Sequence, residues 1–264
     1  MNKLILILFF VFGFVANLYS QTNLNIQYTN GTLSSIPLAD LDSINYTINI
    51  DTCPAFVTDV EGNIYDVVAF GNQCWMKENL KTSHYRNGAL IPSPANDAQW
   101  NATVTGACAD YNYSTANTNI YGKLYNYFAV ADTQGLCPVG WHVTEDWEWN
   151  VVVKRIDPYA DTTCLCYQSL TAGTALKETG YIHWIGPVSS SHSTNSSRLT
   201  LFAGGHRLGQ GSFNTLRQEA FFWTATKIPG TFPYARYLTY LNNCILRTNG
   251  YNGKYGLSVR CVKD

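Results

Sequence analysis

The sequence predicts an α+β domain of short strands, long loops, one or two helices and several disulfides, preceded by a small β-type N-terminal segment. Three observations predict this class. Short apolar runs alternate with Gly, Asn and Pro, which is typical of strands joined by turns. One stretch after Thr144 has helical periodicity. The chain also contains eight cysteines, the first at position 53, and an even number in an exported chain indicates a disulfide framework.

Residues 1–20 have the layout of a secretory signal peptide. Lys3 supplies a positive charge, residues 4–16 form an apolar run, and a polar stretch ends at Ser20, after which we expect cleavage. The apolar run is shorter than the roughly 20 residues that cross a bilayer, which favours a cleaved signal over a membrane anchor. We therefore expect a secreted or cell-surface protein that has no membrane span once the signal is removed.

Residues 21–52 form the predicted N-terminal β segment. Apolar and polar residues alternate loosely on either side of Asn30-Gly31, and residues 43–48 alternate with a period of two. Two or three short strands are too few to hold a core of their own. We place the boundary after residue 52, so that the main domain covers residues 53–264 and is long enough to bury a sizeable core.

The strongest helical pattern follows Thr144. Apolar residues recur along one stripe at Trp149, Val152, Val153 and Ile156. Thr144 is the expected N-cap, the acidic pair after it suits the positive end of the helix dipole, and Pro158 ends the helix. A second short helix is expected around residues 175–178. Residues 58–65 predict a hairpin, and a calcium loop is the alternative interpretation of the acidic residues in its turn.

The composition favours binding to neutral ligands. Only 13% of the residues are charged and the net charge is −1, with no basic stripe, so we expect neither a nucleic-acid partner nor binding to an anionic membrane surface. Aromatic residues reach 14%, and tyrosine alone occupies 18 positions. A surface tyrosine presents a broad ring and a hydroxyl, which suits neutral polar ligands and protein surfaces.

Motifs of catalysis and metal binding are missing. The five histidines show none of the zinc or iron spacings, and Cys164-Leu165-Cys166 is too tight for a usual zinc site. The sequence contains neither a GxSxG motif nor a phosphate-binding loop. We therefore expect no catalytic residue, no metal and no cofactor, although the spacing of the few acidic residues leaves a carboxylate pair for glycoside hydrolysis open.

An ordered series of motifs carries a family resemblance. The motifs are Gly71–Thr82 (GNQCWMKENLKT), Tyr121–Tyr127 (YGKLYNY), Cys137–Val143 (CPVGWHV), Leu176–Gly180 (LKETG) with His183-Trp184, Gly204–Arg207 (GGHR), Phe222–Thr226 (FWTAT) and Ser258–Asp264 (SVRCVKD). The series resembles the Fibrobacter succinogenes major paralogous domain (FISUMP) family over residues 53–264. Residues 38–44 also resemble the short leader that precedes this domain in secreted proteins of the Bacteroidota type.

The resemblance implies a C-type-lectin-like fold related to the formylglycine-generating-enzyme domain, with the two chain ends close together, in an exported surface or adhesion protein. The segment from Phe222 to Cys261 is also similar to the C-terminal part of lectin-fold variable proteins, in which exposed Tyr and Asn residues form the ligand face. The chain departs from the family pattern at Thr144-Glu145, where Pro followed by Thr or Ser is usual, and at Phe202-Ala203, which replaces a Leu-Pro pair.

The resemblance also guides the disulfide pairing. We expect Cys137–Cys261 first, and closing a loop of about 120 residues stabilises a fold by about 4 to 5 kcal/mol. Cys74–Cys108 is the second expected pair. The pairing of the remaining cysteines stays open: Cys53, Cys164, Cys166 and Cys244. A catalytic or copper-binding cysteine pair, as in formylglycine-generating enzymes, is the alternative for them.

The best candidates for a ligand face lie between Tyr234 and Tyr251. If residues 234–243 form a strand, alternation places Arg236, Leu238, Tyr240 and Asn242 on one face and Tyr237, Thr239, Leu241 and Asn243 on the other. Trp100 has loop-like flanks and is expected to be exposed, whereas the motif tryptophans Trp75, Trp141, Trp184 and Trp223 are expected in the core. The candidate ligand-binding residues are Trp100, Tyr234, Arg236, Tyr237, Tyr240, Asn242, Asn243 and Tyr251. An ordinary half-buried strand is the alternative.

These observations predict a secreted or cell-surface binding or adhesion module that recognises a glycan or an extracellular protein. Two alternatives stay open: an enzyme related to formylglycine-generating or sulfatase-modifying proteins, and a structural surface component without a discrete site. An ordered pocket holding two unpaired cysteines or a His/Glu cluster would favour the enzyme, whereas a shallow Tyr/Asn patch with every motif cysteine bridged would favour binding. Calcium is not predicted, because the sugar-binding triplets of calcium-dependent lectins are absent.

Overall fold

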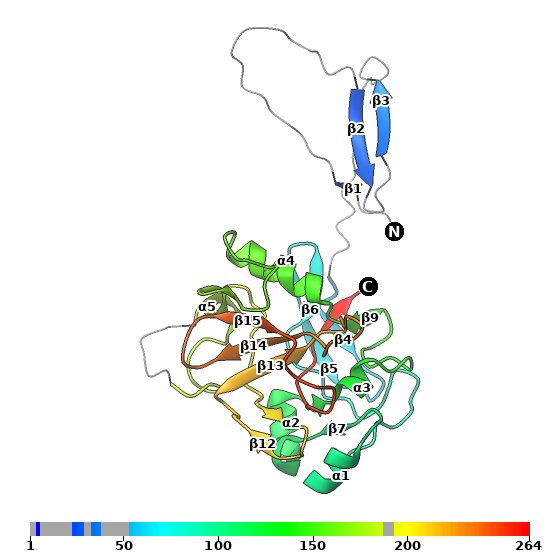
Figure 1. Ribbon diagram of the computed structural model, residues 1–264, viewed down its shortest axis with the longest axis vertical. Coiled ribbons are helices and arrows are strands. Elements are labelled where there is room, and N and C mark those ends of the chain that lie inside the picture. The colour runs from blue at the N-terminus through cyan, green and yellow to red at the C-terminus, as the bar shows by residue number, and fades with distance from the viewer. Residues whose placement is uncertain (1–3, 6–22, 29–32, 38–52, 187–192) are drawn as a thin grey trace. The chain divides into compact units, whose positions relative to one another are not determined.

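The computed structural model describes residues 4–5, 23–28, 33–37, 53–186 and 193–264. The chain divides into two compact units, Met1–Ile50 and Asp51–Asp264 (Figure 1). The predicted signal segment, apart from Leu4–Ile5, lies outside the described residues. So do the predicted strand at residues 43–48 and the leader-like stretch at residues 38–44.

The first unit contains one antiparallel sheet. Its strands are β1 (Leu4–Ile5), β2 (Asn23–Tyr28) and β3 (Leu33–Pro37), in the order β1-β2-β3. Leu24 pairs with Ile36 in the register of β2 and β3. The loose alternation in this part of the sequence therefore corresponds to paired strands.

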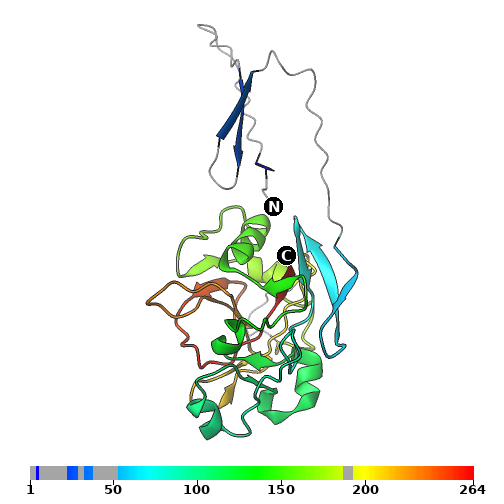
Figure 2. The same cartoon turned by 90° about the vertical axis from the view of Figure 1, so that its right-hand side faces the viewer.

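A five-stranded antiparallel sheet begins the second unit. Its order is β4-β5-β6-β16-β9, with the bounds β4 (Phe56–Thr58), β5 (Ile64–Phe70), β6 (Gln73–Met76), β16 (Cys261–Lys263) and β9 (Trp141–Val143). The last strand of the chain lies inside the sheet, where Val262 pairs with Trp75 of β6 and with His142 of β9. Figure 2 shows this red strand beside the cyan strands that open the unit.

A second antiparallel sheet has the order β10-β15-β14-β13. Its strands are β10 (Tyr167–Ser169), β15 (Ile245–Thr248), β14 (Ala235–Thr239) and β13 (Glu219–Trp223). The unit also contains two small two-stranded antiparallel sheets, called ribbons below. One pairs β7 (Cys108–Ala109) with β8 (Leu124–Tyr125), and the other pairs β11 (His206–Arg207) with β12 (Phe213–Asn214). The sheet of β13 to β15 crosses the middle of the unit in Figure 1.

The helices are short. They are α1 (Asp97–Ala102), the 3-10 turn η2 (Tyr111–Tyr113), α2 (Thr115–Tyr121), α3 (Tyr127–Val130), α4 (Asp146–Ile156) and α5 (Ala172–Leu176). The expected mixed class of few helices, several sheets and disulfides is therefore confirmed. Within the described ranges, no helix has the length and apolar composition that crossing a membrane requires.

Helix α4 confirms the predicted stripe but begins one residue later than expected. Trp149, Val152 and Val153 are buried, as the periodicity predicts. The N-cap is Glu145, which forms a capping box with Glu148. Thr144 is not the cap: its hydroxyl accepts the Trp149 Nε1–H at 2.9 Å, and its backbone N–H donates to Arg260 O just before β16. The second predicted helix, expected around residues 175–178, corresponds to α5, which begins earlier, at Ala172.

The hairpin predicted over residues 58–65 joins β4 to β5. The Asp59 carboxylate accepts the backbone N–H groups of Glu61 and Asn63 at 2.9 and 3.0 Å and the Tyr65 hydroxyl at 2.6 Å. These bonds use the carboxylate to close the turn. The predicted hairpin turn is therefore confirmed.

Two apolar cores lie on opposite sides of β13. The first contains Phe221 and Trp223, and the second contains Phe222 together with Trp75 and Trp149. The ring centroids of Trp75 and Trp149 are 4.9 Å apart in an edge arrangement, and Trp149 lies 5.4 Å from Phe222. All four motif tryptophans are buried, as predicted: Trp75, Trp141, Trp184 and Trp223.

The disulfides are predicted correctly in one case and wrongly in another. Cys137–Cys261 is present and spans 124 residues. Cys74 is bonded to Cys53, not to Cys108. The β4–β5–β6 hairpins bring the start of the unit beside β6, whereas Cys108 lies in the separate β7–β8 ribbon and is free. A third disulfide joins Cys164 to Cys166, and Cys244 is free.

Removing the long-range disulfide is expected to be the most damaging of the cysteine changes. We expect C137A/C261A to lower the free energy of unfolding by about 4 kcal/mol, because the reduced chain regains the entropy of a loop of 124 residues. Urea denaturation measures this. The double variant C164A/C166A is the control and should cost less, since its loop spans only 2 residues. Equal losses in the two variants would contradict the role assigned to Cys137–Cys261.

His142 couples the last residue of the chain to the start of α4. Its Nδ1 lies 2.7 Å from Asp264 Oδ1, and its Nε2 lies 3.1 Å from Glu148 Oε2. The hydrogen bond to Glu148, opposed by burial and helped by Asp264, raises the pKa of His142 to about 9. The imidazolium therefore bridges β9, α4 and the C-terminal residue at neutral pH.

The raised pKa of His142 predicts a pH-dependent stability. Because the folded value exceeds the ordinary value of 6.5, the contribution is complete below about pH 6.5 and is lost as the pH rises through about 9. We expect the urea midpoint of the wild type to fall toward that of H142Q across this window. A difference between the two proteins that stays constant from about pH 6 to about pH 10 would contradict the assignment.

Candidate functional site

Trp100, predicted to be exposed, is buried in the structure. Its exposed fraction is 1%, and its Nε1 donates to Lys254 O at 2.9 Å. The Arg207 guanidinium lies over the ring, 4.3 Å from its centroid. The prediction is wrong because α1 packs its single buried residue against Gly256, whose missing side chain leaves room for the indole.

Arg236 and Tyr234 also lie inside the protein. Arg236 is fully buried, and its NH1 donates to Asp146 Oδ1 at 2.7 Å, so that it ties β14 to α4. Arg247 of β15 donates to the other oxygen of Asp146 at 2.9 Å and covers the Tyr234 ring at 4.5 Å. Asp146, Arg236 and Arg247 hold the second sheet against α4. Tyr234 and Arg236, predicted to lie on a ligand face, are buried instead.

The electrostatics of this contact are strongly coupled. Burial raises the pKa of Asp146, but the hydrogen bonds from Arg247 and the charge of Arg236 outweigh it and hold the value below its ordinary range. Burial lowers the pKa of Arg236 to about 10. The Asp146 carboxylate therefore pairs with two guanidinium groups at the point where the sheet meets the helix.

The strand predicted over residues 234–243 ends at Thr239, so its alternation does not extend to Tyr240, Asn242 and Asn243. Tyr240 is half-buried against the second core. Asn242 and Asn243 lie in the turn before β15, where their backbone oxygens accept bonds from Lys177 Nζ and Gly173 N. The faces predicted for these three residues are wrong, because a turn replaces the strand.

Tyr237 belongs to a row of side chains that crosses all four strands of the second sheet. Phe221, Tyr237, Leu246 and Tyr167 lie opposite one another from β13 to β10. Residues that are paired across strands point to the same face, so these four share the face opposite to Phe222 and Leu238. Phe221 is buried, Tyr237 and Leu246 are half-buried, and 47% of Tyr167 is exposed. The first core therefore covers this face at β13 and leaves it increasingly open toward β10.

Two further tyrosines extend the row beyond the strands. Tyr251 lies 5.5 Å from Phe221 between ring centroids, and Tyr255 lies 5.2 Å from Tyr251. Both are half-buried. We call the surface formed by Tyr167, Tyr237, Leu246, Tyr251 and Tyr255 the tyrosine face. It gathers residues from three segments of the chain on one side of the sheet.

Burial favours the protonated hydroxyls of Tyr237 and Tyr251 in this face. The Tyr237 hydroxyl donates to Glu219 Oε1 at 2.6 Å, and burial together with this carboxylate raises the pKa of Tyr237. Burial raises the pKa of Tyr251 to about 12. His206, whose ring stacks 6.2 Å from Tyr255, has its pKa lowered by burial, so it is neutral at neutral pH. Tyr237 and Tyr251 therefore present neutral hydroxyls, and the Glu219 carboxylate lies beside Tyr237.

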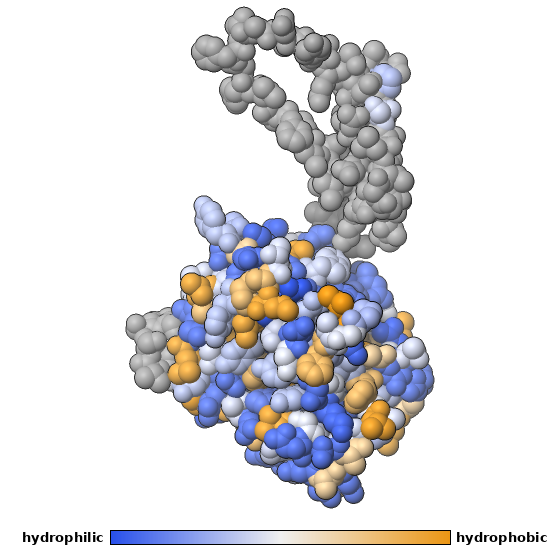
Figure 3. Space-filling model, in the orientation of Figure 1, coloured by the Kyte–Doolittle hydropathy of each residue, from blue (hydrophilic) through white to orange (hydrophobic). Residues whose placement is uncertain are grey.

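Sequence reasoning identified Tyr237 and Tyr251 and missed Tyr167, Leu246 and Tyr255. The signal for Tyr255 was available, since it lies in the same Tyr-rich turn as Tyr251. Tyr167 offers no such signal, because its place depends on β10 pairing with β15, far along the chain. Figure 3 shows hydrophobic residues gathered over β14 and β15, below α4, among hydrophilic neighbours.

The free cysteines lie in different surroundings. Burial raises the pKa of Cys108 to about 12, so it is a protonated thiol in the first core. Cys244 is half-buried just before β15. Within the described part of the chain, no group of three or more His, Cys, Asp or Glu residues has the arrangement of a metal site.

The Asp146 contact predicts a large effect on stability. We expect D146N to lower the free energy of unfolding by roughly 3 to 5 kcal/mol, because two guanidinium groups, one of them fully buried, then lose their carboxylate. Chemical denaturation measures the loss. D66N removes an exposed carboxylate that pairs with Lys77 at 3.2 Å, and it should cost less than about 1 kcal/mol. If D146N cost no more than D66N, Asp146 would not hold the sheet to α4.

Comparison with known proteins adds one match. A family model described as the Fibrobacter succinogenes major domain matches residues 68–263. The match covers both large sheets except β4 and the start of β5, and it includes every residue of the tyrosine face. No curated protein and no solved structure matches the chain.

Proposed function

Because the chain belongs to the Fibrobacter succinogenes major domain family, we propose that it is a secreted or cell-surface binding module that recognises a glycan or an extracellular protein through its tyrosine face. The observation that carries the proposal is the row from Phe221 through Tyr237 and Leu246 to Tyr167, which becomes more exposed along its length. Packing of a core does not by itself require a row of large side chains that becomes more exposed along its length.

The chemistry of the face supports this proposal. Each tyrosine offers a flat apolar ring and a hydroxyl, so it can contact the apolar side of a ligand and hydrogen-bond its polar groups. Tyrosine also loses little conformational entropy on binding, since it has only two side-chain torsions. Paired strands hold Tyr237 and Tyr167, and ring contacts hold Tyr251 and Tyr255. The face is therefore largely ordered before a ligand arrives.

The sequence and the disulfides support the extracellular location. Residues 1–20 have the layout of a secretory signal, and disulfides persist in oxidising compartments. The C-type-lectin-like fold belongs to the same proposal. Support for it comes from the last strand, which pairs inside the sheet that opens the unit, and from the long loops around the second sheet.

The test is a ligand screen followed by substitutions in the face. The full chain is first applied to arrays of glycans and extracellular proteins, and the affinity for each ligand found is then measured for Y167A and Y251A. We expect each variant to bind roughly ten-fold more weakly or worse, as for aromatic residues at the centre of an interface. The control is Y159A, which removes a tyrosine that is 97% exposed and lies outside the face.

Retained affinity in both face variants, with folding verified by circular dichroism, would contradict the assignment of the ligand to this face. Equal losses in Y159A and in the two face variants would point to a general effect of tyrosine removal instead.

A further inference from the structure

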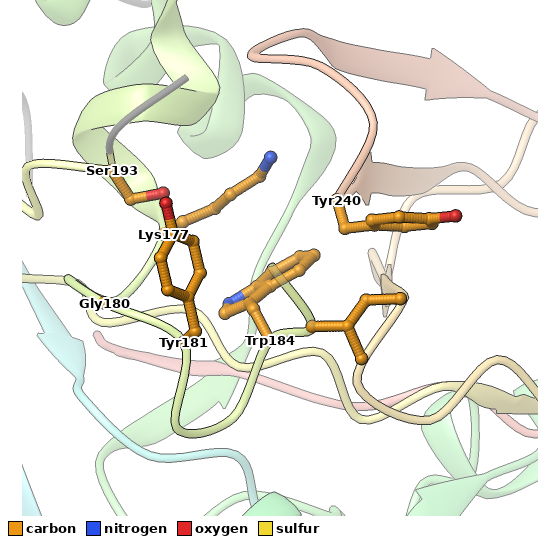
Figure 4. A pocket seen from close by; sticks show the side chains of 7 residues that line it. Lys177, Gly180, Tyr181, Trp184, Ser193 and Tyr240 are labelled. Atoms are coloured by element: carbon orange, nitrogen blue, oxygen red, sulfur yellow. The ribbon is translucent and has the colours of Figure 1, made fainter. Parts of the chain in front are cut away.

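A second candidate site lies on the other side of the second sheet, where a small pocket opens beside α5. The residues that line it are Lys177, Gly180, Tyr181, Trp184, Ile185, Ser193 and Tyr240. Figure 4 shows Tyr181 and Ser193 on one side, Tyr240 on the other and Trp184 between them. Trp184 belongs to the second core and Tyr240 packs against it, whereas Phe221 of the tyrosine row belongs to the first core. The pocket and the tyrosine face are therefore separate.

Lys177 places a buried cation at this pocket. Only 4% of the residue is exposed, and its Nζ donates to Thr239 O at 2.5 Å and to Asn242 O at 2.6 Å. The ammonium also lies 4.9 Å from the centroid of the Trp184 ring. An ammonium has three donors, and among the residues that the structure describes, its hydrogen-bond acceptors are these two neutral carbonyl oxygens.

The charge of Lys177 therefore lacks a counterion in the described part of the chain. Arg236, a buried cation within this sheet, has the Asp146 carboxylate at 2.7 Å. Burial lowers the pKa of Lys177 to about 8, in keeping with a cation that is costly to hold without a partner. A ligand that brings a carboxylate to the pocket would supply the missing negative charge.

The walls of the pocket indicate what carries that carboxylate. Two aromatic rings, from the exposed Tyr181 and the half-buried Tyr240, can contact the apolar faces of a ring-shaped ligand above the buried Trp184, and Ser193 and the tyrosine hydroxyls can bond its polar groups. Gly180 leaves the rim open, since a Cβ at this position would meet no atom within 4 Å. A pyranose sugar is a ring of this kind, with apolar C–H faces and polar hydroxyl groups at its edge.

We propose that this pocket binds a sugar acid, a pyranose ring whose carboxylate pairs with the Lys177 ammonium while its ring lies against the aromatic side chains.

The test uses two probes that differ only in the charged group. The full chain is titrated with galacturonic acid and with galactose by isothermal calorimetry near pH 7. We expect the acid to bind and galactose to bind at least roughly ten-fold more weakly, because it lacks the charge-assisted hydrogen bond. K177M should weaken binding of the acid by a similar factor. The control is K227M, which removes an exposed lysine outside the pocket and should leave the affinity unchanged.

A measurement on the wild type guards against misfolding of K177M. The NMR signal of the Lys177 side chain is followed as the pH is raised, with and without galacturonic acid. We expect the acid to raise the pKa of Lys177, since a bound carboxylate favours the charged amine. An unmoved titration, equal binding of galactose and galacturonic acid, or full affinity in a folded K177M would each overturn the proposal. Loss of the tyrosine-face ligand would not, because the two sites are separate.

Discussion

The structure of the second unit depends on the course of its last residues through the middle of the protein. The backbone of Ser258 accepts a hydrogen bond from Trp223 N and donates one to Phe221 O, so the segment borders the second sheet.

Arg260, two residues later, is fully buried. It donates to Asn79 Oδ1 at 2.6 Å and to the carbonyls of Met76 and Leu199 at 2.8 and 2.9 Å. The next residues form β16 inside the first sheet and carry the disulfide to Cys137. Both large sheets are therefore fixed to one short segment.

This arrangement explains why the second sheet has one closed face and one open face. Its inner face carries Phe222 and Leu238 into the second core, and the pairing of Arg236 with Asp146 locks that side to α4. Its outer face is covered at β13 by the first core and is open toward β10. The inner contacts and the C-terminal segment hold the sheet in place, so the exposed parts of the tyrosine face remain available to the ligand that we propose.

The local features of the fold could be predicted from the sequence, and the side of the sheet that each residue faces could not. The helical stripe through Trp149 and the turn at Glu61-Gly62-Asn63 depend on residues that are close together in the sequence. Their patterns can therefore be recognised in the sequence itself. Arg236 and Tyr237 are adjacent and equally plausible in the sequence, yet one is fully buried and the other lies on the open face. Only the position of α4, which carries Asp146, decides between them. Tyr167 was missed for a similar reason, since its place depends on long-range pairing with β15.

The most direct test of the central claim is amide hydrogen exchange of the full chain, free and bound to a ligand that the arrays identify. The account predicts added protection in residues 235–256 and at Tyr167, on the strands and the turn that carry the tyrosine face. It predicts little change in α1 or in the β4–β5 hairpin. Protection confined to those distant elements, with the exchange of residues 235–256 unchanged, would contradict the assignment of this face as the ligand surface.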